Sequence, residues 1–420
     1  MIGRVGIVGA GASGLAAAIA AARAGAQVTV IEHMDKAGKK ILSTGSGRCN
    51  LSNRKMDASC FRCGQDGFPM KVIGGFGLEE TLGFFEGLGI LIKDRNGYLY
   101  PYSDQASSVR DVLLQEAERR RVQIHLSCHI SGIEEDAKGG FLLHTDQGRL
   151  KEDALILAAG SKAAPATGSD GSGYELAKGL GHSVIKPLPA LVQLRCQGTM
   201  YRQMAGVRTD AAVRLFADGK LMAEDRGELQ LVDYGLSGIP IFQVSRFAAR
   251  ALDQRKRVTV RVDFMPAWEE REAFGLLKRR ASLLGYKPAG EFFTGMLNPK
   301  ISQVLLKLAG ISPSVKAGEL TGKQLGRLLE QLKSYEAIVM SVNPFANAQV
   351  CCGGVDTRQV DPQTMESRIK KGLYFAGEIL DVDGICGGYN LQFAWSSGVI
   401  AGRSAARNLE RAKTGRGGRK

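Results

Sequence analysis

The sequence lacks any apolar stretch that approaches the roughly 20 residues of a membrane-spanning helix. Its first predicted strand begins within a few residues of Met1, which leaves no room for the charged region, apolar region and cleavage site of a secretory signal. The eight cysteines follow no regular spacing, so they predict no disulfide framework. We therefore expect a soluble protein of the cytoplasm with free thiols and no membrane insertion.

Acidic residues are fewer than basic ones, 42 against 56, which leaves a formal net charge of +14. This excess favours anionic partners, namely nucleic acid, membrane surfaces, or phosphorylated and carboxylated small molecules. Part of the excess lies in segments that we expect to be solvated, Arg119 to Arg121 and the terminal GRGGRK. With 44% hydrophobic and 23% charged residues, a chain of 420 residues predicts a globular protein of two or three domains.

Residues 5 to 32 predict a strand, a glycine-rich turn, a helix and a second strand, in that order. The turn carries Gly9, Gly11 and Gly14, the three glycines of a G-x-G-x-x-G pattern. Gly9 permits the tight turn, Gly11 lets the backbone approach a pyrophosphate, and Gly14 lets the helix pack against the sheet. The second strand ends at Glu32, where an acidic residue binds ribose hydroxyls. The unit predicts an ADP-bearing cofactor but does not separate FAD from NAD.

A second glycine-rich stretch, residues 372–401, indicates which cofactor the turn binds. The run from Leu373 to Ala376 predicts a short buried strand that leads into Glu378, whose carboxylate can accept hydrogen bonds from ribityl hydroxyls. A turn with three glycines then precedes a helix from about Leu391 to Ala406. The positive end of that helix would stabilise negative charge on a reduced flavin ring. NAD has no use for this arrangement, so the sequence favours FAD.

The apolar run at 154–158, which ends in Ala159-Gly160, predicts a further strand of the same parallel sheet, ending beside the cofactor. Residues 189–344 contain no second complete glycine turn and read as β-rich in their first half and helical in their second. We expect an α/β protein with a Rossmann-like FAD-binding domain over residues 1–188 and 345–420. An inserted substrate domain, β-rich and then helical, would interrupt it over residues 189–344.

Four segments resemble the YhiN-like or BaiN-like family of FAD-dependent oxidoreductases, within the glutathione-reductase-type flavoproteins: GAGASGLAAA at 9–18, STGSGRCNLSN at 43–53, CGGVDT at 352–357, and YFAGEILDVDGICGGYNLQFAWSSG at 374–398. The resemblance covers essentially the whole chain and implies FAD in a two-part domain. The residues that it places on FAD are Gly9, Gly11, Ser13 and Gly14 at the pyrophosphate, Glu32 at the adenosine ribose, Lys40, Gly45, Arg48, Cys49 and Asn50 along the chain of the cofactor, Ile130 at the adenine through its backbone, Gly160 beside the cofactor, Gly377, Glu378 and Asp383 at the ribityl or pyrophosphate, and Asn390, Leu391 and Gln392 at the ring.

Cys49 is the thiol expected nearest the flavin. Disulfide reductases of the broader class need two neighbouring cysteines there, and only one is present, so we expect a thiol without a redox role. Cys60 and Cys63 form a C-x-x-C pair without the second pair of a zinc site; we expect surface thiols and no metal. Cys351 and Cys352 are too close in the chain for an ordinary disulfide, and their role stays open.

These features predict an enzyme that moves a hydride between a small organic substrate and N5 of the flavin, with NAD(P)H or oxygen completing the cycle. The resemblance implies either reduction of conjugated enone bonds in steroid-like substrates or amine oxidation. No general acid is assigned; Tyr98, Tyr100 and Tyr102 are conceivable, but such a cluster also fits packing. Two alternatives stay open, an RNA-associated flavoprotein of the tRNA-modifying kind and a flavin-binding sensor without turnover.

Overall fold

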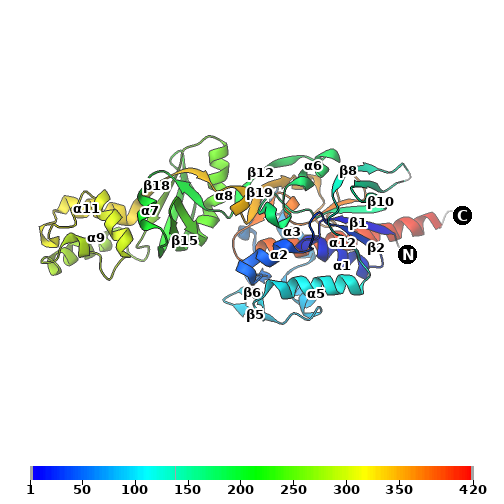
Figure 1. The fold of residues 1–420 in the computed structure, drawn as a ribbon, viewed down its shortest axis with the longest axis horizontal. Coiled ribbons are helices and arrows are strands. Elements are labelled where there is room, and N and C mark those ends of the chain that lie inside the picture. Colours follow the sequence, from blue (N-terminus) through cyan, green and yellow to red (C-terminus); the bar gives the residue numbers. More distant parts are fainter. Residues whose placement is uncertain (1–2, 138, 418–420) are drawn as a thin grey trace. The chain divides into compact units, whose positions relative to one another are not determined.

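The computed structural model describes residues 3–137 and 139–417, and the chain divides into two compact units (Figure 1). Unit 1 consists of Met1–Leu188 and Val350–Lys420, and unit 2 of Pro189–Gln349. Each unit has a hydrophobic core of its own. The terminal GRGGRK segment, predicted to be solvated, lies partly outside the described residues.

A parallel sheet of five strands forms the centre of unit 1, in the order β20-β11-β1-β2-β7. β1 carries the start of the glycine turn and lies between two neighbours, with every residue after its first one buried. The strand predicted at 154–158 is β11, which pairs with β1 as expected. The five strands are β1 (Arg4–Val8), β2 (Gln27–Ile31), β7 (Gln123–His125), β11 (Ala154–Leu157) and β20 (Leu373–Phe375).

Two helices from opposite ends of the chain pack closely on each other in unit 1, α1 (Ala12–Arg23) and α12 (Tyr389–Gly417) (Figure 1). α12 begins two residues before the predicted start and runs beyond the predicted end at Ala406, through residues that are half-buried or exposed as far as residue 414. The other helices of unit 1 are α2 (Lys39–Ser43), α3 (Phe68–Gly75), α4 (Leu78–Glu86), α5 (Ala106–Arg119) and α6 (Ser172–Gly179).

Four small sheets complete unit 1. The first is antiparallel and joins β8 (Ile130–Glu135), β9 (Phe141–Thr145) and β10 (Gly148–Glu152); the second joins β3 (Ser52–Asn53), β5 (Ile92–Arg95) and β6 (Tyr98–Pro101). The others pair β4 (Phe61–Cys63) with β21 (Val382–Gly384), and β12 (Val184–Ala190) with β19 (Val350–Val355). These last two pairings join strands that lie far apart in the sequence.

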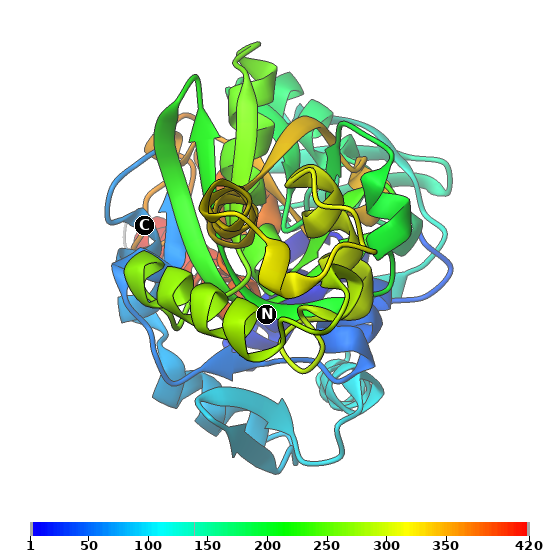
Figure 2. The same ribbon diagram turned by 90° about the vertical axis from the view of Figure 1, so that its left-hand side faces the viewer.

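Unit 2 contains a closed sheet of six strands in its first part and helices in its second, so the predicted fold class is confirmed (Figure 2). In Figure 2 the long strands are green and the helices lime to yellow. The strands are β13 (Leu194–Cys196), β14 (Arg208–Ala217), β15 (Lys220–Val232), β16 (Gly235–Gly238), β17 (Val258–Asp263) and β18 (Tyr335–Val342); the helices are α7 (Met200–Met204), α8 (Ile239–Asp253), α9 (Glu270–Leu283), α10 (Pro299–Leu308) and α11 (Gly322–Ser334). Among the described residues, none of the helices combines the length and apolar character needed to cross a bilayer.

Candidate active site

Of the three glycines in the turn between β1 and α1, two have no room for a side chain and one has room. A Cβ at Gly9 would lie 2.6 Å from the carbonyl oxygen of Ala158, and a Cβ at Gly14 would lie 1.9 Å from that of Gly9. At Gly11, by contrast, a Cβ would meet no atom within 4 Å. Gly11 is also the N-cap of α1, where no side chain caps the helix. Because uncapped N–H groups and the helix dipole favour an anion, this open position fits a phosphate group.

Glu32 lies at the end of β2 and is held against the turn. Its Oε2 accepts a hydrogen bond from the backbone N–H of Ala10 at 2.7 Å, and its Oε1 accepts one from Met34 at 2.9 Å. The Glu32 carbonyl accepts the N–H of Cys128 at 3.0 Å, which places the nearby start of β8, Ile130, at the same edge of the sheet. The predicted ribose ligand and adenine contact therefore lie in one region.

Lys40 and Glu378, 338 residues apart in sequence, form an ion pair with Nζ 2.6 Å from Oε2. Lys40 also donates to the carbonyl of Ala163 at 3.2 Å, and the Ser161 hydroxyl donates to the same Glu378 oxygen at 3.2 Å. Ser161 directly follows Gly160, so the ends of β11 and β20 meet around this pair. Sequence reasoning missed Ser161, although its position after a predicted strand end was a usable signal.

Ser13 and Gly377 fix the first turn of α1 to the end of β20. The Ser13 hydroxyl donates to the carbonyl of Ala376 at 3.2 Å, and a Cβ at Gly377 would lie 2.4 Å from the Ser13 oxygen. Gly377 donates its N–H to the Ser397 hydroxyl on α12 at 2.9 Å. The Ser13 side chain thus joins α1 to the end of β20. Only the backbone N–H of Ser13 is left for the predicted pyrophosphate contact.

The loop that carries Gly45, Arg48, Cys49 and Asn50 turns sharply. Cys49 has φ of +59°, so the chain reverses there and buries the Cys49 side chain completely while Arg48 stays exposed. Burial raises the pKa of the Cys49 thiol to about 12, which keeps it protonated at neutral pH. The thiol is therefore no thiolate nucleophile.

In the described part of unit 1, seven buried side-chain polar atoms have no hydrogen-bond partner, and two of them lie near the glycine motifs: the amide oxygen Oδ1 of Asn50 and the hydroxyl of Tyr174. Asn50 Oδ1 lies against Gly388, where a Cβ would be 2.9 Å from it, and Tyr174 lies within electrostatic range of Glu378. Buried polar atoms are nearly always paired in folded proteins. Together with the open position at Gly11, these orphaned atoms fit a polar cofactor lying between the two glycine motifs. Sequence reasoning missed Tyr174, which ends the TGSDGSGY segment.

At the start of α12, the polar side chains that the resemblance places at the flavin ring make hydrogen bonds within the protein. Asn390 accepts the N–H of Gly384 at 2.8 Å and donates to its carbonyl at 3.0 Å, which closes the preceding loop. Gln392 is fully buried; its Oε1 accepts the Ser52 hydroxyl at 2.6 Å and its Nε2 donates to Thr81 at 2.8 Å. Both side chains therefore bind protein groups. Leu391 is half-buried at the core edge, and Asp383 is buried on β21 opposite Arg62.

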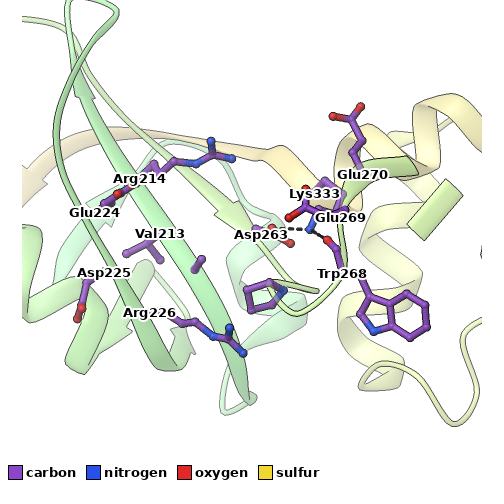
Figure 3. A pocket seen from close by; sticks show the side chains of 12 residues that line it. Val213, Arg214, Glu224, Asp225, Arg226, Asp263, Trp268, Glu269, Glu270 and Lys333 are labelled. Carbon is purple, nitrogen blue, oxygen red and sulfur yellow. Dashed lines mark hydrogen bonds and ion pairs between the residues drawn. The ribbon is translucent and has the colours of Figure 1, made fainter. Parts of the chain in front are cut away.

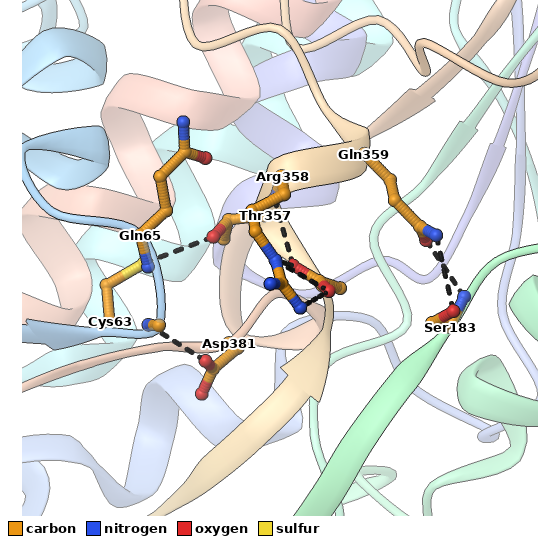
Figure 4. A network of polar contacts seen from close by, with 9 residues as sticks. Cys63, Gln65, Ser183, Thr357, Arg358, Gln359 and Asp381 are labelled. Carbon is orange, nitrogen blue, oxygen red and sulfur yellow. Dashed lines mark hydrogen bonds and ion pairs between the residues drawn. The ribbon is translucent and has the colours of Figure 1, made fainter.

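The prediction of surface thiols at the C-x-x-C pair is wrong for Cys60, which is 1% exposed because it packs under β21 and Tyr389. Cys63 is half-buried, with Sγ 3.3 Å from the Thr357 hydroxyl (Figure 4). Asp381 belongs to the same network (Figure 4). It accepts the N–H groups of Gly64 and Gly353, each at 3.0 Å. Asp381, which sequence reasoning did not select, therefore joins two of the four family segments, 352–357 and 374–398, to the loop after the C-x-x-C pair.

Cys351 and Cys352, whose role the sequence left open, are both buried on β19. Burial raises the pKa of the Cys351 thiol to about 11, so this thiol also stays protonated. All eight cysteines are free, and among residues 3–137 and 139–417 no three His, Cys, Asp or Glu side chains gather as metal ligands would.

Unit 2 has a polar pocket of about 570 Å³, shown in Figure 3. At its centre Lys333 pairs with Asp263 at 2.6 Å and donates to the carbonyl of Trp268 at 2.6 Å. Its lining contains five acidic and three basic side chains, and it includes none of the residues that the sequence placed on a cofactor. The pocket therefore adds no group suited to hydride chemistry.

The family model described as the HI0933-like protein Rossmann domain matches residues 3–404. The chain belongs to this family. The family resemblance predicted from the four segments is thus confirmed, and with it the prediction of an FAD-dependent oxidoreductase.

Among relatives, a 3-dehydro-bile acid delta(4,6)-reductase of Clostridium scindens is 46% identical over 405 residues, covering 96% of this chain and 99% of that protein. A ribosomal RNA dihydrouridine synthase of Haemophilus influenzae is 26% identical over 407 residues, 96% of this chain and 98% of the relative. The solved structure of a 3-ketosteroid-delta4-(5alpha)-dehydrogenase from Rhodococcus jostii RHA1 matches with a TM-score of 0.47 and 16% identity, covering 96% of each chain.

Proposed function

We propose that this HI0933-like family member is an FAD-dependent reductase of conjugated enones in ring-bearing substrates, with NAD(P)H as the electron donor. One observation carries the proposal: the chain is 46% identical to the Clostridium scindens bile acid reductase along nearly the full length of both proteins. At that identity over nearly the full length of both proteins, the two chains share a fold. Amine oxidation, the other activity that the motifs left open, has no comparable support.

The cofactor supplies hydride transfer when bound, and the protein supplies position and charge. In this proposal the backbone N–H groups after Gly11 bind the pyrophosphate, and Glu32 binds the adenosine ribose. The ion pair of Lys40 and Glu378 orients the ribityl end, since Ser161 and Ala163 restrain both of its partners. The first turn of α12 directs its positive end at the ring.

Two features support NAD(P)H as the electron donor: the protonation of the buried thiols, and the lack of a second nucleotide-binding glycine turn among the described residues. Cys49 and Cys351 are buried thiols, so no thiolate pair relays electrons to the cofactor. The described part of the chain contains one glycine turn of the G-x-G-x-x-G type, in β1–α1, and none in unit 2. NAD(P)H is therefore proposed to bind directly over the ring. We place the activity in the cytoplasm, in keeping with eight free cysteines.

The test is anaerobic and follows the visible absorption of the protein-bound flavin. NADH or NADPH should bleach the band, and a 3-oxo-Δ4 steroid carboxylate should restore it with stoichiometric loss of the enone absorbance. The matched control is the saturated 3-oxo steroid carboxylate, which should restore nothing. Protein that binds FAD but is bleached by neither donor, or is reoxidised equally by both steroids, contradicts the proposal. A bound flavin without any turnover would instead support the sensor alternative.

A second candidate is action on RNA, favoured by the 26% identity with a ribosomal RNA dihydrouridine synthase and by the formal net charge of +14. Burial and the neighbouring guanidinium groups of Arg407 and Arg23 lower the pKa of Arg403, so like charges crowd at the ends of α1 and α12. Such crowding is relieved by phosphate. Binding of a ribosomal RNA helix that weakens steeply between 50 and about 200 mM salt supports this candidate, and no binding at low salt excludes it.

A further inference from the structure

The strand β6 presents two tyrosines on its outer face. Its residues alternate, with Leu99 and Pro101 buried beneath and Tyr98 and Tyr100 on the opposite side. Tyr98 is 42% exposed, and Tyr100 is half-buried. Packing beneath the strand is therefore done by the other two residues, and the phenol rings are not needed to fill the core.

The two rings lie against the two loops that carry the predicted flavin contacts. A Cβ at Gly387 would be 3.0 Å from Cε1 of Tyr98, and a Cβ at Gly45 would be 3.7 Å from Cε1 of Tyr100. Gly387 belongs to the loop before α12, and Gly45 to the loop that ends at Asn50. The hydrogen bond from Asn53 Nδ2 to the Gly387 carbonyl, 3.0 Å long, holds the first of these loops against β3. The tyrosine face thus borders both loops.

Positive charge surrounds this face, and one cation is uncommitted. Arg95 lies 5.7 Å from the Tyr100 ring centroid and pairs with Asp104 at 2.6 Å; Lys93 pairs with the same carboxylate. Arg48 acts electrostatically on Tyr100 and on the Asp104 carboxylate, is exposed, and makes no ion pair or side-chain hydrogen bond with any other described residue. An exposed guanidinium without a partner, beside aromatic rings, suits a carboxylate on a ring-bearing molecule.

We propose that Tyr98, Tyr100 and Arg48 form the acceptor subsite, in which the rings of the substrate pack on the two phenol rings and its carboxylate pairs with the Arg48 guanidinium. The inference rests on the proposed function for the identity of the acceptor. It assigns Arg48 to the substrate rather than to FAD, which is the role that the motif gave it. The outward position of Arg48, fixed by the chain reversal at Cys49, is the reason.

The test compares Arg48→Gln with Arg149→Gln, a matched change at an exposed arginine on β10. Each FAD-loaded variant is assayed with a 3-oxo-Δ4 steroid carboxylate and with its methyl ester. Arg48→Gln should raise KM for the carboxylate about tenfold, leave KM for the ester within about twofold, and leave the FAD content unchanged. Arg149→Gln should change neither KM. Loss of FAD from Arg48→Gln, or equal effects on acid and ester, overturns the assignment.

A second variant, Tyr98→Ala, should raise KM for acid and ester by the same factor, about fivefold, because it removes a ring surface and no charge. Equilibrium dialysis of the two steroids against each holoenzyme separates this inference from the proposed function. If the wild type binds the acid without reducing it, the reductase proposal fails, while weaker binding of the acid alone by Arg48→Gln still supports the subsite. If the wild type binds neither steroid, the subsite is refuted.

Discussion

Gly11 and Gly14 should respond in opposite ways to a side chain, although both belong to one turn. A Cβ at Gly11 meets open space, and its φ of −83° suits any residue, so Gly11→Asn should fold normally. Asn caps a helix at least as well as glycine, and the FAD-free variant should unfold within about 2 °C of the wild type. Gly14→Ala should lower the free energy of unfolding by about 3 kcal/mol, because its Cβ would lie 1.9 Å from the Gly9 carbonyl.

For FAD affinity the order of the two variants should be reversed: Gly11→Asn should bind FAD weakly, and Gly14→Ala should bind it well. In Gly11→Asn the new side chain occupies the position of the pyrophosphate, so about two charge-assisted hydrogen bonds to backbone N–H groups are lost. At about 1.5 kcal/mol each, their loss weakens FAD binding by at least about a hundredfold. Gly14→Ala protein that remains folded should still bind FAD, since its new methyl group points toward β1 and the Gly9 carbonyl.

The assay is thermal unfolding of each FAD-free protein with and without added FAD, alongside fluorescence titration of FAD. FAD at about 100 times the wild-type Kd should stabilise the wild type by about 2.7 kcal/mol and Gly11→Asn by no more than about 0.4 kcal/mol. The reasoning is refuted if Gly11→Asn binds FAD like the wild type, because the backbone at Gly11 would then not approach the cofactor. It is also refuted if Gly11→Asn, rather than Gly14→Ala, proves to be the unstable protein.

Three further variants test other parts of unit 1. Burial raises the pKa of Glu152 from 4.5 to about 7, so ionisation of this carboxyl at higher pH opposes folding. The wild type should therefore lose about 3 kcal/mol of its free energy of unfolding between pH 4.5 and 8. Glu152→Gln should remove this pH dependence, as measured by urea titrations at several pH values. Gln392→Leu should lower the free energy of unfolding by about 3 kcal/mol while folded protein keeps its FAD affinity, whereas loss of affinity at unchanged stability would mean that Gln392 contacts the ring. Cys49→Ala should retain turnover within about twofold. Neither the variant nor the wild type should show a thiolate-to-flavin absorption band between pH 6 and 9, because the Cys49 thiol of the wild type is protonated in that range.

The sequence predicted those parts of the site that local sterics determine. Gly9 and Gly14 have no room for a Cβ because strand, turn and helix follow each other within a dozen residues, and that order is visible in the pattern. The pairing of Lys40 with Glu378 was beyond reach, since each residue was placed on the cofactor separately and only the fold brings them to 2.6 Å.

The side-chain partners of polar residues near glycines could not be predicted from the sequence, for a related reason. A glutamine at the start of a helix looks the same in sequence whether it faces a ligand or the core. In the structure, the partners of Gln392 are Ser52 and Thr81, which come from β3 and α4 more than 300 residues earlier. The burial of Cys60 likewise depends on β21, which pairs with β4 across the same long separation.

The position of the second glycine motif relative to the first is set by the contact between α1 and α12. A Cβ at Gly398 would lie 2.4 Å from the carbonyl oxygen of Ser13, and one at Gly402 would lie 2.2 Å from that of Ala17. The two backbones therefore touch along one face of each helix, without side chains between them. Because close-packed backbones have little freedom to slide, the N-terminus of α12 stands at a fixed place relative to the turn at Gly11. A chain that returns to its first domain after an insertion of about 160 residues can in this way rebuild one continuous cofactor site.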